Sequence, residues 1–154
     1  MLSRMPTIWA ARSTPSASFR SAVRRWLPKA RVAVDHFHLV KLGNDMLTGM
    51  RRRVSWDRHD RRGRKSDFAW AHRLLLLRGY NTLSSRGREK LNQVLRTDDP
   101  TDEIGAAWGI KEQLRLTLMS TTLTQARERK ATFDQYIAAA RLPEADRLKK
   151  TIDS

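Results

Sequence analysis

The 154-residue sequence contains no cysteine, which excludes disulfide bonds and thiolate metal sites. It has no apolar run near the roughly 20 residues that cross a bilayer, and its longest leucine run, Leu74–Leu77, is far too short. Its four histidines include no HExxH pair, so a zinc-hydrolase function has no support. The length of 154 residues is enough for one domain with a modest hydrophobic core.

Acidic residues are scarce, and none precedes Asp35. Thirty-one lysines and arginines face sixteen acidic residues, for a net charge of +15. Such an excess repels itself unless a polyanion or a missing acidic part of the protein neutralises it, and nucleic acid is the first partner to consider. Residues 1–70 carry sixteen basic and five acidic groups, so we expect this half to contact the polyanion. A GC-rich genome, which enriches arginine codons, is a second explanation for part of the surplus.

Apolar spacing predicts one strand among several helices. A helix is expected over residues 16–27, ended by Pro28, and a strand covered on both faces is expected over residues 31–34. The helical period resumes at Leu39 and continues into the Arg51–Lys65 stretch, whose RRGRK end is a loop. Further helices are expected at 67–77 with Asp67 as cap, from Ser84 or Ser85, after the DDPTDE run, from about Thr124, and from Pro143. A single strand without partners is typical of an incomplete piece of a larger α/β domain, here in a mainly α chain.

Residues 1–15 show little periodicity and contain no acidic residue. That composition is compatible with a mitochondrial transit peptide. Since the segment has no clean amphipathic repeat, we prefer to interpret it as a poorly ordered start of the chain.

Asp35 follows the predicted strand directly and has two possible roles. Ligands and catalytic groups gather at the carboxyl ends of strands in open α/β sheets, and a carboxylate there can bind Mg²⁺. Alternatively, Asp35 caps the next helix. His36 and His38 can also face a metal, although packing beside polar neighbours is the commoner use of such histidines.

A dense basic cluster lies within Arg51–Lys65. Its eight cationic residues are accompanied by two acids and by Trp56, which offers a stacking surface. Neutralisation of DNA phosphates is the function we predict for the cluster. The eight residues are Arg51, Arg52, Arg53, Arg58, Arg61, Arg62, Arg64 and Lys65. Trp70 and Trp108 have apolar neighbours and are interpreted as core residues, and Glu112 as a surface or salt-bridging residue.

The segment VAVDHFHLVKLGNDML resembles the bacterial insertion-sequence DDE transposases of the ISL branch, in which a strand ends in Asp before a helix. The upstream SASFRSAVRRWLPKA and the downstream RRGRK, RLLLL, LNQVL and AAWGIKEQLR also resemble this family, over about Ser16 to Ile152. The resemblance implies an RNase H-like catalytic core in which two Asp and one Glu hold two Mg²⁺ ions that activate water or a 3′ hydroxyl. It assigns Asp35 to the second Asp.

The resemblance also implies a domain division: an unmatched start at 1–15, a partial RNase H-like core at 16–62, and a helical insertion at 63–154. Carboxylates matching the first Asp and the Glu are missing from the sequence, and Glu103, Glu112, Glu128 and Glu144 are poor replacements. We therefore interpret the chain as a truncated, bacterial, cytoplasmic and nucleoid-associated transposase piece. It is expected to bind DNA, to associate with an intact transposase or with itself, and to be inactive alone, without contact to a membrane.

Three alternatives remain open from sequence. The first is a complete, small, basic helical protein that binds DNA and regulates it. The second is a structureless translation product without function, and the third is a mitochondrial matrix protein.

Overall fold

The computed structural model describes residues 36–154, and residues 40–154 of it form one compact unit. The described part of the chain is mainly helical and contains no strand, as expected for the region after Asp35. The strand expected at 31–34, Asp35 itself and the helix expected at 16–27 lie outside the described residues. The RNase H-like core is therefore untested by the described structure.

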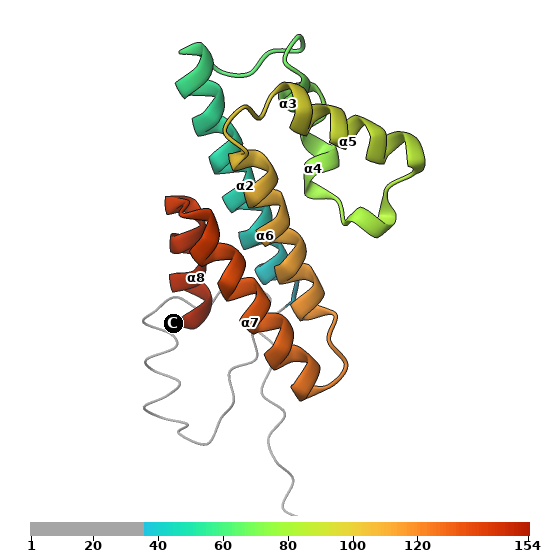
Figure 1. Cartoon of the computed structure of the whole chain (residues 1–154), viewed down its shortest axis with the longest axis vertical. Coiled ribbons are helices and arrows are strands. Elements are labelled where there is room, and N and C mark those ends of the chain that lie inside the picture. The colour runs from blue at the N-terminus through green and yellow to red at the C-terminus, as the bar shows by residue number, and fades with distance from the viewer. Residues whose placement is uncertain (1–35) are drawn as a thin grey trace, which may run out of the picture. The chain divides into compact units, whose positions relative to one another are not determined.

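The described residues form seven α-helices and one short 3₁₀ helix (Figure 1). In chain order they are α2 (His36–His59), α3 (Phe68–Ala71), α4 (Arg73–Leu77), the 3₁₀ helix η1 (Tyr80–Thr82), α5 (Ser85–Thr97), α6 (Glu103–Leu118), α7 (Leu123–Ala140) and α8 (Pro143–Asp153). The predicted end of the first long helix is confirmed, because α2 ends at His59 and the RRGRK residues 61–65 are loop.

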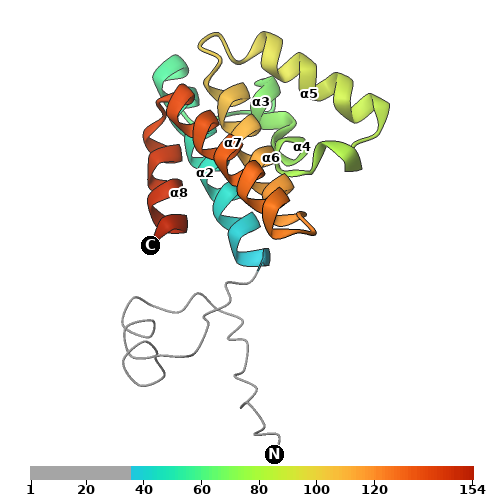
Figure 2. The same ribbon diagram turned by 60° about the horizontal axis from the view of Figure 1, so that its bottom comes forward.

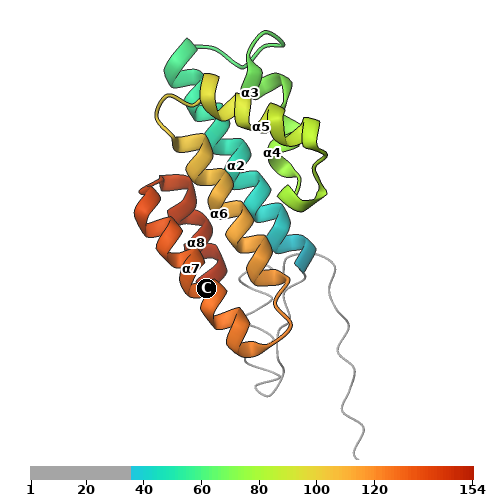
Figure 3. The ribbon, with the colours of Figure 1, turned by 45° about the vertical axis from the view of Figure 1, so that its right-hand side comes forward.

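Helix α6 lies at the centre of the unit. Figures 1 and 3 show α2 beside α6, the α7–α8 pair on one side of these two helices, and α3 to α5 on the other. Figure 2 shows α5 as an outer helix that crosses above α3 and α4. The core side chains recur at helical spacing on α2 and α6. They include Leu47, Met50 and Val54 from α2 and Ile104, Ala107, Ile110 and Leu114 from α6, with Phe133 and Ile137 from α7, all buried.

Several helices begin where the sequence predicts, because a polar side chain accepts a hydrogen bond from a free backbone N–H. Ser84 Oγ accepts from Gly87 N at 3.1 Å, and Thr122 Oγ1 accepts from Gln125 N at 3.1 Å. Asp99, from the DDPTDE run, accepts from Ile104 N and Gly105 N at 2.9 and 2.8 Å. These contacts occupy donors that each helix start leaves unpaired.

The expectation of one continuous helix over 67–77 is wrong, although Asp67 does occupy the N-cap position of α3. The segment is split into α3 and α4 at His72, and Asp67 makes no side-chain bond to the helix start. Its carboxylate instead accepts two bonds from Arg61, at 2.7 and 3.0 Å, and one from Arg64 N at 2.7 Å. The free backbone N–H of Ala69, at the start of α3, donates instead to the carboxylate of Asp98, at 2.7 Å.

Lys111 attaches the α4 segment to α6. Its buried ammonium donates to the carbonyl oxygens of Leu76 and Arg78, at 2.9 and 2.7 Å, at the end of α4. It also lies 2.8 Å from the buried carboxylate of Glu112. Burial lowers the pKa of Lys111, and its contacts with Glu112 partly offset this effect. Three partners thus compensate a cation in the interior.

Arg53 joins three helices through one guanidinium. From α2 it donates to Glu144 of α8 at 2.7 Å and lies 3.3 Å from Glu103 of α6. The hydrogen bond from Arg53 holds the pKa of the Glu144 carboxyl below its usual value, against the opposing effect of burial. Arg53 is therefore a structural residue as well as a member of the predicted basic cluster.

Replacement of Lys111 by Met tests the attachment of α4. We expect Lys111→Met to lower the free energy of unfolding by about 3 kcal/mol, because it leaves two carbonyls without their buried donor and Glu112 with Arg115 as its remaining cation. Urea titration followed by circular dichroism measures the change. The exposed Lys150→Met is the control and should lie within about 0.5 kcal/mol of the parent. A loss below about 1 kcal/mol for Lys111→Met would contradict the assignment.

The Arg53–Glu144 pair predicts a pH-dependent variant. Because the folded pKa of Glu144 is depressed, its contribution is present above the unfolded value of about 4.3 and disappears as pH falls through the folded pKa. Glu144→Gln should therefore be less stable than the parent at pH 7, by about 1–2 kcal/mol. The gap between the two melting temperatures should close on acidification below about pH 4. A constant gap across pH would show that the charge of Glu144 contributes nothing.

Candidate nucleic-acid interface

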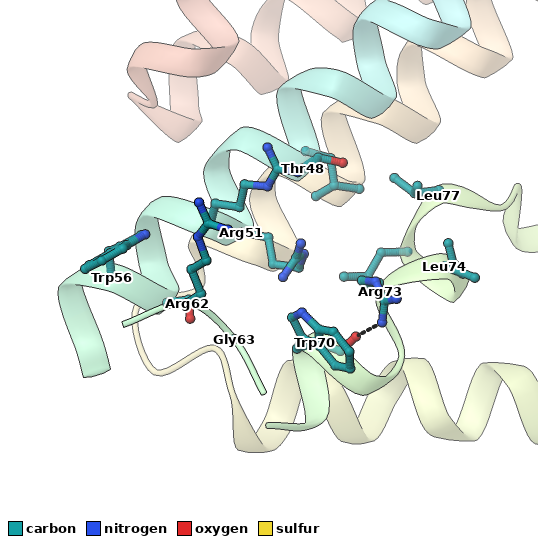
Figure 4. A pocket seen from close by; sticks show the side chains of 13 residues that line it. Thr48, Arg51, Trp56, Arg62, Gly63, Trp70, Arg73, Leu74 and Leu77 are labelled. Carbon is teal, nitrogen blue, oxygen red and sulfur yellow. Dashed lines mark hydrogen bonds between the residues drawn. The ribbon is translucent and has the colours of Figure 1, made fainter. Parts of the chain in front are cut away.

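A cleft of about 540 Å³ lies between α2, the loop after it, and the α3–α4 segment. Among the described residues, four arginines and no acidic residue line it, together with two tryptophans and several leucines. We call it the arginine cleft and define it by Arg51, Arg52, Trp56, Arg62, Trp70 and Arg73 (Figure 4). The concentration of like charge indicates an anion as its ligand.

The α2 side of the cleft follows from helical spacing. Arg51 and Arg52 precede Ser55 and Trp56 by four residues, so the two pairs share one side of α2 one turn apart. Trp56 is half exposed, at 50%. An exposed indole beside arginines is a stacking platform for a nucleobase.

Arg51 is the least exposed cation of the cleft, at 8%. Its guanidinium makes no hydrogen bond or ion pair with any residue in the described part of the chain. Burial lowers its pKa, and repulsion from Arg52 and Arg73 lowers it further. A buried cation without a carboxylate partner is costly for the fold.

The opposite wall is built on Trp70. The Arg73 guanidinium lies 4.0 Å from the centre of the Trp70 ring and donates to the Trp70 carbonyl oxygen at 2.9 Å. Gly63 packs against the same side chain so closely that an added Cβ would lie 2.5 Å from Trp70 Cδ1. Only glycine permits this approach. Stacking on Trp70 orients Arg73 within the cleft, as Figure 4 shows.

A sharp turn at Asp60 starts the loop that borders the cleft. Asp60 has a positive φ of 50°, a conformation that aspartate tolerates, and its N–H donates to the Trp56 carbonyl. Asp67 then holds the loop through Arg61 and Arg64 N. Arg62, Arg64 and Lys65 are exposed on this loop. The loop is therefore anchored by one arginine while it presents three other cations.

The structure divides the eight predicted basic residues into two groups. Arg53, Arg58 and Arg61 pair with carboxylates of this chain: Arg53 with Glu144 and Glu103, Arg58 with Asp98 at 3.4 Å, and Arg61 with Asp67. The other five, Arg51, Arg52, Arg62, Arg64 and Lys65, form no ion pair with the described residues. These five remain predicted DNA contacts, and the first three lie in the arginine cleft.

Two cleft residues were missed by sequence reasoning. Arg73 stands outside the Arg51–Lys65 stretch, and Trp70 was assigned to the core, although it lines the cleft. For Arg73, the only sequence signal was the RLLLL block of the family resemblance, which begins at this residue.

Trp108 is partly buried against the core, as expected. Glu112 is salt-bridged as expected, but it is buried, where hydrogen bonds from Arg115 and Lys111 outweigh burial and hold its pKa low.

Metal ligation cannot be assigned within the described residues. No three of their histidine, aspartate and glutamate side chains are grouped as a metal site requires. Asp35, the predicted ligand, lies outside them. Among residues 36–154, no helix has the length and apolarity needed to cross a membrane.

A family model described as transposase, of the DDE type of ISL3 elements, matches residues 11–154. The chain belongs to this family. The match covers almost the whole sequence and begins slightly before the Ser16 at which we expected it. No curated protein and no solved structure matches. DDE transposases generally use divalent metal ions, bind DNA and often oligomerise.

The unpaired charge of Arg51 predicts a stability signature. We expect Arg51→Met to raise the free energy of unfolding of the transposase chain by about 1 kcal/mol, because it removes an uncompensated buried cation and keeps the side-chain volume. Thermal and urea unfolding measure this change. Arg52→Met removes the same charge from an exposed neighbour and should stay within about 0.5 kcal/mol. Clear destabilisation by Arg51→Met would mean that its guanidinium supports the fold.

Proposed function

We propose that the helical region of this transposase binds DNA through the arginine cleft and the adjoining loop, as part of DNA transposition and recombination. The observation that carries the proposal is the group of arginines in the cleft without a neutralising carboxylate. The planar guanidinium can donate two parallel hydrogen bonds to two oxygens of one phosphate. Arginine therefore suits this contact better than lysine.

The proposed surface consists of cations that form no ion pair with residues 36–154. Arg52 and Arg62 lie at the exposed side of the cleft, and Arg64 and Lys65 extend it along the loop. Arg53, Arg58 and Arg61 instead hold the helices and the loop in place. The surface is thus a set of phosphate contacts on an ion-paired frame. Such contacts position DNA without reading its sequence.

We further propose that catalysis depends on a metal site to which this chain contributes Asp35. The cofactor would be Mg²⁺, the carboxylate one of its oxygen ligands, and the surrounding domain RNase H-like. The described residues do not supply the remaining ligands. We therefore expect the 154-residue chain alone to bind duplex DNA without cutting or joining it, and to need an intact transposase copy for strand transfer.

Charge-matched variants test the DNA-binding proposal. Replacement of Arg62, Arg64 and Lys65 by Gln removes three proposed phosphate contacts. Because each contact releases condensed counterions, the slope of log affinity against log salt should fall in magnitude by about 2 to 3. Fluorescence polarisation with a labelled blunt DNA duplex at several salt concentrations gives the slope.

The control removes three exposed cations from α7 and α8, at Arg127, Arg147 and Lys150. It lowers net charge equally, so a general electrostatic effect would appear in both triple variants. Equal reductions of the salt slope in the two triple variants would mean that DNA contacts another surface. If the parent chain does not bind duplex DNA at all, the proposal is wrong.

A further inference from the structure

The arginine cleft has two features that contact with a duplex surface does not require. Arg51 is more than nine-tenths buried, and Trp56, which lines the same cleft, is half exposed. The phosphates of duplex DNA lie on a convex rod, whose bases are stacked inside. A duplex can contact Arg52, Arg62 and the loop. Its phosphates do not enter the cleft as far as Arg51, and its stacked bases present no face to Trp56.

We infer that the arginine cleft binds an unpaired nucleotide of a DNA strand, whose phosphate lies against Arg51 and Arg73 while its base stacks on Trp56. The inference rests on the proposed DNA-binding function and specifies the ligand of the same surface. A cavity of about 540 Å³ lies within the size range of small-molecule sites, about 300–1,000 Å³. A single nucleotide is a ligand of this class, whereas a duplex is too wide to enter.

The charges of the site fit a phosphate group. Arg51 has no anionic partner among the residues that the structure describes, and Arg73 is already oriented by Trp70. Two guanidiniums on one anion relieve the mutual repulsion that arises when both are charged within a shared cleft. Residues 1–34 carry seven basic and no acidic side chains, so Asp35 is the one carboxylate outside the described residues.

The apolar parts of the site fit a base. Trp56 and Trp70 both line the cleft, with leucines of α2 and α4 behind them. One face of Trp70 is already covered by Arg73 and its edge is approached by Gly63, which leaves Trp56 as the accessible stacking surface. Stacking on an indole accepts any base, so the site selects an unpaired nucleotide by its conformation and not by its sequence.

The test compares two DNA probes with the full chain. One is a blunt duplex, and the other is the same duplex extended by a few unpaired nucleotides, as a 5′ or a 3′ overhang. Fluorescence polarisation should show tighter binding of an overhang probe. Trp56→Ala should lower affinity for that probe by about 5- to 100-fold, the range for loss of one stacked base, and leave the blunt duplex nearly unchanged. Trp56→Phe keeps a ring and should retain most of the preference.

Arg51→Met provides the second arm. It should remove the preference for the overhang although the variant remains folded, which its melting curve verifies. Tyr136→Ala removes a similarly exposed aromatic residue from α7 and should change neither affinity.

Equal binding of blunt and overhang probes, or equal loss of both on Trp56→Ala, would overturn this inference while the duplex-binding proposal stands. Binding of the overhang probe alone would support the inference and overturn the duplex proposal, and binding of neither probe would overturn both.

Discussion

The ammonium of Lys111 determines where the wall of the arginine cleft stands. It bonds the carbonyls of Leu76 and Arg78 and so fixes the end of α4 against the central helix α6. Trp70 and Arg73 belong to the same short segment, and α3 and α4 are too short to be stable alone. Lys111, whose charge Glu112 compensates, therefore fixes their position together with the buried side chains of Ala69 and Leu76 and the Ala69 N–Asp98 hydrogen bond.

Two kinds of arginine follow from this arrangement. Arg53 pairs with carboxylates of α6 and α8 and so connects three helices. Arg61 pairs with Asp67 and so holds the loop that follows α2. Arg51 has the opposite character, because it lies near Arg52 and Arg73 without an ion pair to the described residues, and we expect its charge to cost the fold stability. A charge tolerated at such a cost is typical of a binding site. Composition alone cannot separate these groups, since each arginine contributes equally to the net charge.

The helices could be predicted from sequence to the extent that local signals decide them. Ser84, Thr122 and Pro143 sit at the starts of α5, α7 and α8, and the period from Leu39 continues to the observed end of α2. Asp67 misled the prediction because a carboxylate before an apolar run resembles a cap, while its strongest partner, Arg61, lies on the preceding side. The choice between these partners is a tertiary property.

Only one of the two walls of the cleft could be predicted from the sequence. Its α2 side appears in the sequence as cations and a tryptophan one turn apart, whereas its other wall depends on the fold that brings Arg73 and Trp70 opposite Arg51. Trp70 shows why such walls are missed: an indole that packs on Gly63 and under a guanidinium has the apolar neighbours of a core residue. Because stacking on Trp70 fixes the Arg73 guanidinium before any ligand arrives, an incoming phosphate need not order that side chain. This preorganisation favours binding by removing an entropic cost.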